Sequence, residues 1–189
     1  MKKSLGAETI ACPSPVWCIG SYDRNRKPNL MTAAWAGICS SSPPAVSVSL
    51  REATYTYQNL IDSGAFTVNI PSDAYLEEAD YVGTVSGKDT DKFQATGLTP
   101  VSSEKVDAPY VLEFPLVIEC KLIHHHEIGL HTQFIGEIVD VMVDPERLSE
   151  DGKADMGKIR PFLFSPGERT YYGIGQRIGG AFEIGKGLF

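Results

Sequence analysis

"PPAVSVSLREATYTYQNLIDSGAFTVNIP", residues 43–71, reads as a strand, a short helix and a second strand. Residues 45–51 and 65–71 each alternate apolar and polar side chains, which is the period of a half-buried strand. Between them, Thr54 offers a helix cap and Gly64 a helix stop, so the sequence predicts a helix over 54–64. The side chains expected to face the core are Val46, Val48, Leu50, Phe66, Val68 and Ile70.

The strand pattern continues on both sides of this stretch. Residues 15–22 are apolar and aromatic, and residues 114–129 place an apolar side chain at every second position from Leu116 to Leu122. Gly129 interrupts that run, and residues 131–144 follow as its hairpin partner. A further helix is predicted over 73–83, and 148–160 reads as a loop with a helical end. We therefore expect a mainly β (α+β) protein, an antiparallel closed or partly closed barrel with a few short helices, in one domain over 1–189.

Composition excludes several classes of function. A net charge of −7 disfavours nucleic acid as a partner, because phosphate backbones require clustered Lys and Arg. No apolar run approaches the roughly 20 residues of a membrane span, and no signal peptide is recognisable, so a cytoplasmic protein is expected. The four cysteines show no zinc or disulfide spacing and are expected to be reduced thiols, three of them buried.

The strongest candidate site follows the strand at 45–51. Alternation places the side chains opposite the core valines on one face, and two threonines follow at the start of the predicted helix. Hydroxyls, a guanidinium and helix amides together can bind an anion such as a phosphate. An ordinary polar outer face with a threonine cap is the alternative. The residues concerned are Ser47, Ser49, Arg51, Thr54 and Thr56.

"MTAAWAG", residues 31–37, combines small side chains with one indole. Small side chains allow a flat ring to lie close to the backbone.

Three other motifs are weaker evidence for a functional site. "GIGQRIG" at 173–179 has too little chain after it for a dinucleotide-binding unit. His124 and His126 share one strand face while His125 points away, and no ligand cluster completes a metal site with them or with His131. The segment 86–97 reads as a loop that presents Lys92 and Phe93 to a ligand or anchors itself on the core.

Taken together, three segments in this order and spacing resemble the flavin reductase-like family of FMN-binding split barrels. They are "NLMTAAWAGICSSSPPAVSVSLREATYTYQNLIDSGAFTVNIP", "SGKDTDKF" and "GLHTQFIGEIVDV", and the chain end "YYGIGQRIGGAFEIGKGLF" extends the similarity. The resemblance implies a six-stranded Greek-key barrel, a homodimer and one FMN per subunit near the interface. One departure is Leu130, where the family often has an acid, so the role of His131 does not follow from the family.

The resemblance also implies which residues contact the flavin. In this frame Ala33 and Ala34 let the ring approach the backbone, whose amides tune its redox potential, and Trp35 supplies a wall. The hydroxyls and Arg51 hold the 5′-phosphate. The implied positions are Asn29, Met31, Thr32, Ala33, Ala34, Trp35, Ser47, Val48, Ser49, Leu50, Arg51, Thr54, Thr56, Lys92 and Phe93.

Three functions are compatible with this pattern. The first is an FMN protein that carries electrons between redox partner proteins. The second is an NAD(P)H:flavin oxidoreductase, in which a nicotinamide stacks on an exposed flavin face. The third is a barrel that binds flavin or haem as a sensor or store, but haem would leave the phosphate-binding group without a purpose. The overall similarity favours the electron carrier.

Overall fold

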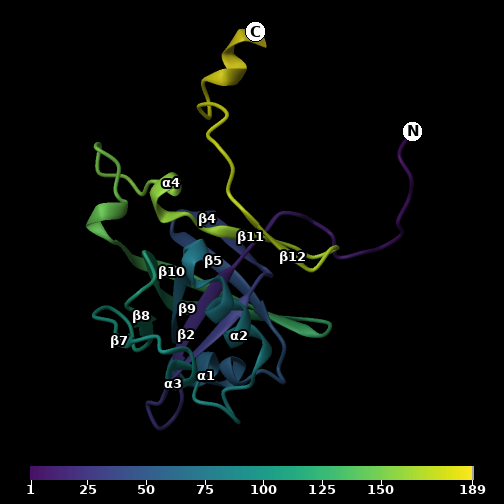
Figure 1. Cartoon of the computed structure of the whole chain (residues 1–189). Helices are drawn as coiled ribbons and strands as arrows, with labels where there is room; N and C mark the ends of the chain where they lie inside the picture. The colour runs from purple at the N-terminus through teal and green to yellow at the C-terminus, as the bar shows by residue number, and fades with distance from the viewer. Residues whose placement is uncertain (189) are drawn as a thin grey trace.

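The computed structural model describes residues 1–188, and its centre is a seven-stranded antiparallel sheet (Figure 1). The strand order is β3-β2-β6-β9-β10-β5-β4, with separate small sheets β1-β11-β12 and β7-β8. The strands are β1 (Ser14–Pro15), β2 (Trp17–Tyr22), β3 (Pro28–Ala33), β4 (Ala36–Ser41), β5 (Pro44–Leu50), β6 (Ala65–Ile70), β7 (Pro100–Ser102), β8 (Pro109–Val111), β9 (Leu116–Ile128), β10 (His131–Val143), β11 (Phe162–Ser165) and β12 (Thr170–Gly173). The α-helices are α1 (Tyr55–Ser63), α2 (Leu76–Thr84), α3 (Lys92–Thr96) and α4 (Met156–Ile159), and the 3₁₀ turns are η1 (Asp73–Tyr75), η2 (Pro145–Arg147) and η3 (Ile184–Leu188).

The sheet curls into a barrel because of how its two edge strands are connected. β3 and β4 lie at opposite edges of the strand order, yet only Ala34 and Trp35 separate them in the chain. The two edges must therefore meet at this bend. A backbone hydrogen bond from Ser49 N to Trp35 O, 2.8 Å long, ties the bend to the end of β5. The barrel is thus closed by the chain itself at one corner and remains split along the rest of that seam.

Two apolar clusters make up the core. One fills the barrel, with Val46, Val48 and Leu50 of β5 packed against Phe66 and the neighbouring strands. The other lies between β2–β3 and the segments that cover them, among them α2, α3 and β11. The predicted alternation of β5 is confirmed, since the three side chains expected to face the core, Val46, Val48 and Leu50, are fully buried. Strand β6 differs, because Thr67 and Asn69 on its other face are buried as well.

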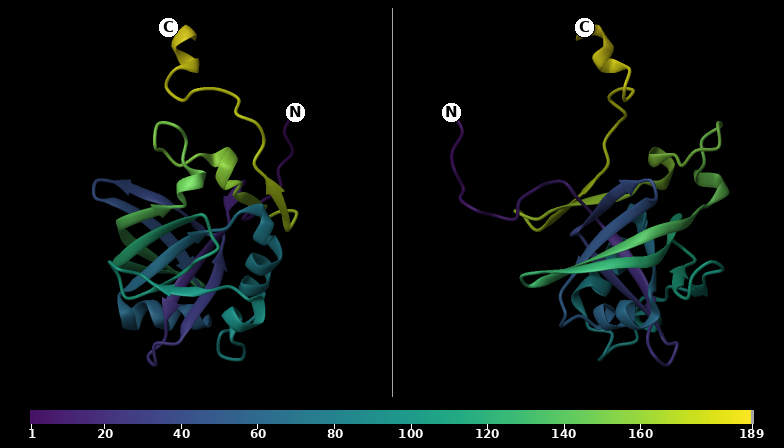
Figure 2. Two further views of the ribbon diagram at one scale, coloured as in Figure 1. Left: turned by 60° about the vertical axis from the view of Figure 1, so that its left-hand side comes forward. Right: turned by 180° about the vertical axis from the view of Figure 1, so that it is seen from behind.

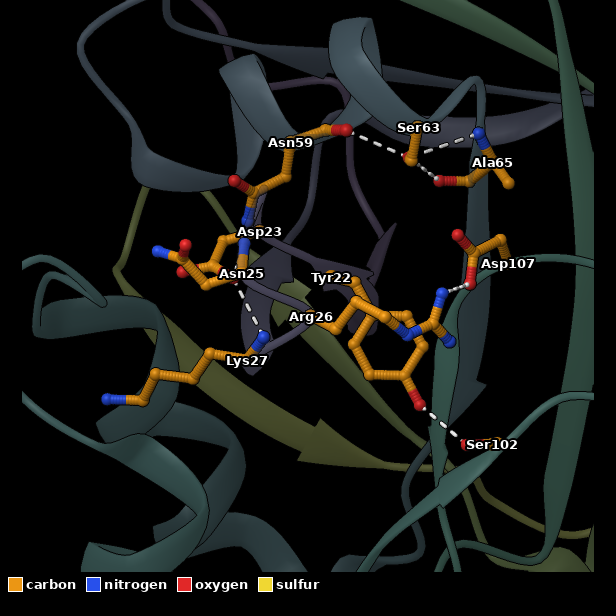
Figure 3. Close-up of polar contacts among 10 residues, drawn as sticks. All are labelled: Tyr22, Asp23, Asn25, Arg26, Lys27, Asn59, Ser63, Ala65, Ser102 and Asp107. Atoms are coloured by element: carbon orange, nitrogen blue, oxygen red, sulfur yellow. Dashed lines mark hydrogen bonds and ion pairs between the residues drawn. The ribbon is translucent and has the colours of Figure 1, made fainter.

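The two glycines that the sequence marks as breaks adopt the left-handed conformation. Gly64 has a φ of +64° and caps α1, and Gly129 has a φ of +54° in the β9–β10 turn. An L side chain rarely adopts this conformation, so glycine ends each element at little cost. The hydroxyl of Ser63 reinforces the first break, lying 2.8 Å from Asn59 O and 2.9 Å from Ala65 O (Figure 3).

The β2–β3 turn holds α1 in place against the barrel. The carboxylate of Asp23 accepts hydrogen bonds from the backbone N–H groups of Asn25 and Lys27, at 2.8 and 2.7 Å (Figure 3). Its other oxygen accepts from the Tyr55 hydroxyl at 2.8 Å, at the first residue of α1. These hydrogen bonds lower the pKa of Asp23 against the opposing effect of desolvation, so the carboxylate is ionised at neutral pH.

Several expectations need correction. The helix predicted over 73–83 is divided into η1 and α2. The segment 86–97, predicted as a loop, contains the short helix α3, and the side chain of Asp91 caps it by accepting a hydrogen bond from Gln94 N. Thr54 occupies the N-cap position of α1, but its hydroxyl donates to Arg51 O instead of capping the helix. Two cysteines are buried, Cys18 and Cys120, and not three. Within residues 1–188, no helix has both the length and the apolar character that crossing a bilayer requires.

Candidate functional site

A cavity of about 360 Å³ follows β3 and opens beside the bend at Ala34 and Trp35. Its volume is within the range of pockets that hold small molecules and cofactors. Because β3 is an edge strand with β2 as its strand neighbour, half of its backbone polar groups are not used in the sheet. The lining residues are Val16, Met31, Thr32, Ala33, Ala34, Trp35, Ser49, Leu50, Arg51, Thr54, Asp80, Gly83, Thr84, His131, Phe164 and Tyr171.

One end of the cavity is built to attract an anion. Arg51 and Thr54 lie in the connection from β5 to α1, just before the N-terminus of that helix, and both line the cavity. Among the described residues the Arg51 side chain makes no ion pair, and no side chain caps α1. Unpaired helix amides carry partial positive charge, and a free guanidinium can grip two oxygens at once. This end of the cavity therefore fits a phosphate group.

The other part of the cavity is lined by small residues. Ala33 ends β3, Ala34 forms the bend, and Trp35 is 40% exposed at the cavity mouth. The "MTAAWAG" stretch is thus a strand, a bend and the start of a second strand. Its short side chains leave the backbone of the bend accessible, which is the property that a flat ring needs.

The opposite wall comes from distant parts of the chain that the sequence analysis did not assign. Helix α2 supplies Asp80, Gly83 and Thr84, and the small sheet supplies Phe164 and Tyr171. The Tyr171 hydroxyl donates to Asp80 at 2.7 Å and so joins β12 to α2 across the cavity. Burial, and then the Asp80 carboxylate, raise the pKa of Tyr171 above its ordinary value, so the phenol stays protonated.

Thr32 separates the cavity from a buried thiol. Its hydroxyl lies 3.3 Å from Cys18 Sγ and donates to Ala79 O in α2. Burial raises the pKa of Cys18 to about 12, although the hydrogen bond with Thr32 opposes that shift. Cys18 is therefore a neutral thiol that packs behind the wall and not a nucleophile.

Lys92 is held inside the protein by two backbone carbonyls. Its ammonium is buried, donates to Leu30 O at 2.8 Å and to Val82 O at 2.7 Å, and does not line the cavity. It thus joins β3 to α2, two elements that both contribute residues to the cavity lining. Burial lowers the pKa of Lys92 to about 8, and the nearby Cys18 thiol acts against this shift.

We expect stability to depend on pH through Lys92. Its pKa falls from 10.5 to about 8 on folding, so the unfolded chain binds more protons between these values. The free energy of unfolding should then rise with pH across this window, relative to Lys92→Met, whose side chain has no charge to bury. Urea unfolding of both proteins from pH 7 to 9.5 measures the difference between their free energies of unfolding. The other titrating groups contribute equally to both proteins and cancel in this difference. Parallel pH profiles would contradict it.

Six of the implied flavin contacts lie outside the cavity lining, and nine lie within it. Asn29 is buried and donates to the Thr56 hydroxyl at 2.9 Å, in the packing between β3 and α1. Val48 is fully buried in the barrel core. The six are Asn29, Ser47, Val48, Thr56, Lys92 and Phe93. Most of them support the lining from behind, which spacing along the chain could not distinguish from direct contact.

His131 lines the cavity at the start of β10, whereas His124, His125 and His126 do not. The ring centroids of His124 and His126 are 6.2 Å apart, and His125 lies beside Phe134 at 6.0 Å. The predicted alternation of the three histidines is thereby confirmed. No group of three or more potential metal ligands occurs among residues 1–188.

Comparison with known proteins agrees with this architecture. The family model described as "Flavin reductase like domain" matches residues 9–172. The chain belongs to this family. It is similar to flavoredoxin of Desulfovibrio vulgaris (Miyazaki F), at 56% identity and a TM-score of 0.95 over 98% of this chain and 100% of that one. Flavoredoxin from Methanosarcina acetivorans aligns with a TM-score of 0.94 at 28% identity, over 100% of each chain.

Similarity to a third solved structure identifies the fold of this flavin reductase-like chain as a split barrel. It is described as a putative flavin reductase with split barrel domain, from Shewanella frigidimarina, with 28% identity and a TM-score of 0.82 over 96% of this chain and 100% of that one. The barrel with its seam at the Ala34–Trp35 bend is therefore the split barrel of the family, with few and short helices. The expectation of a mainly β split barrel with few short helices is confirmed, but the main sheet has seven strands and not the six that the resemblance implied.

Proposed function

We propose that this protein binds FMN in the cavity along β3 and transfers electrons with it, in the manner that the name flavoredoxin implies. The observation that carries the proposal is the pairing of a free guanidinium and uncapped helix amides with a small-residue bend in one cavity. A phosphate at one end and a flat ring at the other match these two features. The similarity to two flavoredoxins supports the same assignment.

The chain's own residues have separate tasks in this proposal. Arg51, Thr54 and the first amides of α1 bind the phosphate, and Ser49 extends that group along β5. Ala33 and Ala34 leave room for the ring beside free backbone groups of the edge strand, and Trp35 shields its mouth. Asp80 and Tyr171 hold the far wall at a set distance. When bound, the flavin accepts and passes on electrons, and donors around the ring tune its potential.

We expect the purified protein to be yellow and to release FMN, not FAD, on denaturation. The cavity offers one phosphate-binding end, and FAD needs a second place for its adenylate half. Chromatography of the released flavin against both standards measures this. A colourless protein that does not take up added FMN would overturn the proposal.

The alternative function is that of an NAD(P)H:flavin oxidoreductase. The description of the family as flavin reductase-like, and of one solved relative as a putative flavin reductase, supports it. In that case NADH or NADPH reduces the flavin directly, and no separate nucleotide-binding domain is required. Steady-state oxidation of both nucleotides with excess free FMN decides between the two. Turnover at or above about 10 s⁻¹, a typical enzyme value, favours the reductase. Slow turnover with rapid electron exchange to a redox partner protein favours the carrier.

We also propose that the protein is a homodimer. Exposed apolar side chains accompany the cavity mouth, among them Trp35, and a second copy is the partner present wherever the chain is present. Light scattering at micromolar concentration, with flavin bound, measures the mass. A monomer under those conditions would contradict this part of the proposal.

A further inference from the structure

The chain ends in an arm, residues 175–188, that stands clear of the barrel in both views of Figure 2. Its apolar side chains face solvent: Ile178 is 90% exposed and Phe182 94% exposed, and Ile184 and Leu188 are exposed as well. The backbone hydrogen bonds found in the arm are local, between residues 180 and 186. An apolar segment with no contact to its own barrel gains stability only by packing against something else.

The total surface of the chain agrees with a missing contact. Its accessible surface is 11600 Å², and its mass is 20.6 kDa. A compact monomer of this mass should expose about 8,900 Å², from the scaling of surface with mass. The excess is about 2,700 Å², more than the roughly 800 Å² that each partner buries in a standard interface. The extended shape thus leaves enough surface for a stable dimer.

Strands β4, β9 and β10 and the β9–β10 turn carry further exposed apolar side chains, among them Ile128 of β9 at 59% exposure, and these together are called the apolar face. Ile38 of β4 is 79% exposed, and Leu130 in the β9–β10 turn is 67% exposed. Val139 and Val141 of β10 are exposed too. Leu130 directly precedes His131, and Trp35 directly precedes β4, so both ends of this set adjoin residues that line the cavity.

We propose that the arm 175–188 of one copy packs on the apolar face of β4, β9 and β10 of a second copy. This inference deepens the homodimer of the proposed function and rests on it. Both surfaces belong to the same chain, so a two-fold dimer covers each arm and each face at once and leaves neither exposed. An unrelated partner would have to match both separately. The arm would then border the partner's cavity beside Trp35 and so complete the site from the other subunit.

The test uses substitutions that a monomer would not notice. Phe182→Asp and Ile38→Asp change side chains exposed to solvent, so neither should affect folding of the isolated chain. We expect each to raise the dimer dissociation constant at least tenfold, measured by sedimentation from nanomolar to micromolar concentration. The double variant should raise the dissociation constant by less than the product of the two single-variant increases, because both substitutions break the same contact. Leu112→Asp, an exposed leucine between β8 and β9, is the matched control and should leave the constant unchanged.

The outcomes separate this inference from the dimer itself. A dimer that keeps its wild-type dissociation constant with Phe182→Asp, and in a chain ending at Gly173, overturns the arm contact while the dimer stands. A wild-type chain that is monomeric overturns both. A monomer whose melting temperature falls with Phe182→Asp shows the arm packed on its own barrel, and this also overturns the inference.

Discussion

Gly20→Ala should abolish stable folding or lower the free energy of unfolding by about 3 kcal/mol or more. Gly20 lies in β2 with its α-carbon against the carbonyl of Pro109 and the hydroxyl of Thr67, and an added methyl would overlap both. Neither neighbour can yield cheaply. The Thr67 hydroxyl donates to Pro109 O at 2.6 Å in the buried interior, and Asn69 donates to Thr67 in turn. Chemical denaturation with circular dichroism measures the loss.

Gly37→Ala is the control for this experiment. Gly37 also lies in a strand, β4, but an added methyl meets no atom within 4 Å. Alanine costs less backbone entropy than glycine, so this variant should be as stable as the wild type or slightly more so. Equal destabilisation by the two substitutions would show that β-strand glycines matter here for their backbone and not for the contact at Gly20.

Arg51→Ala should weaken FMN binding by one to two orders of magnitude and leave folding unchanged. A charge-assisted hydrogen bond to a phosphate contributes on the order of 1.5–3 kcal/mol. The Arg51 side chain is exposed and forms no ion pair with the described residues, so its removal should change the free energy of unfolding little. Fluorescence titration of the apoprotein with FMN measures the dissociation constant.

Lys105→Ala is the matched control, since it removes the same positive charge from an exposed position outside the cavity lining. It should leave FMN binding within about twofold, because a solvent-exposed charge that makes no contact with the ligand is largely screened. If Arg51→Ala also falls within that range, Arg51 is a surface charge and the phosphate end of the cavity is misassigned. If both variants weaken binding alike, net charge and not local contact attracts the flavin.

Local pattern was sufficient for much of the fold. The alternation of residues 45–51 depends on a two-residue period that burial on one face imposes, and β5 follows it. The glycine breaks at 64 and 129 follow from the same local logic, because few other residues adopt a positive φ at low cost. The connection of the strand end to Arg51, Thr54 and the start of α1 is equally local, and the structure places both residues at the cavity.

Local pattern could not decide which side chains reach the cavity and which support it from behind. In the sequence, Lys92 and Asn29 cannot be told from exposed polar residues. In the structure both are buried: Lys92 donates to Leu30 O and Val82 O, and Asn29 donates to the Thr56 hydroxyl.

The sequence by itself determined the strands of the barrel core, their glycine breaks and the position of Arg51 and Thr54 before α1, since each depends on near neighbours in the chain. Only the tertiary structure decided the far wall and the direction of the buried polar groups. Asp80 and Tyr171 are 91 positions apart, and their hydrogen bond exists because Tyr171 packs on the core cluster to which α2 contributes Ala79 and Val82. Such contacts depend on how the closed barrel positions α2 and the small sheet, and no periodicity within either segment encodes that placement.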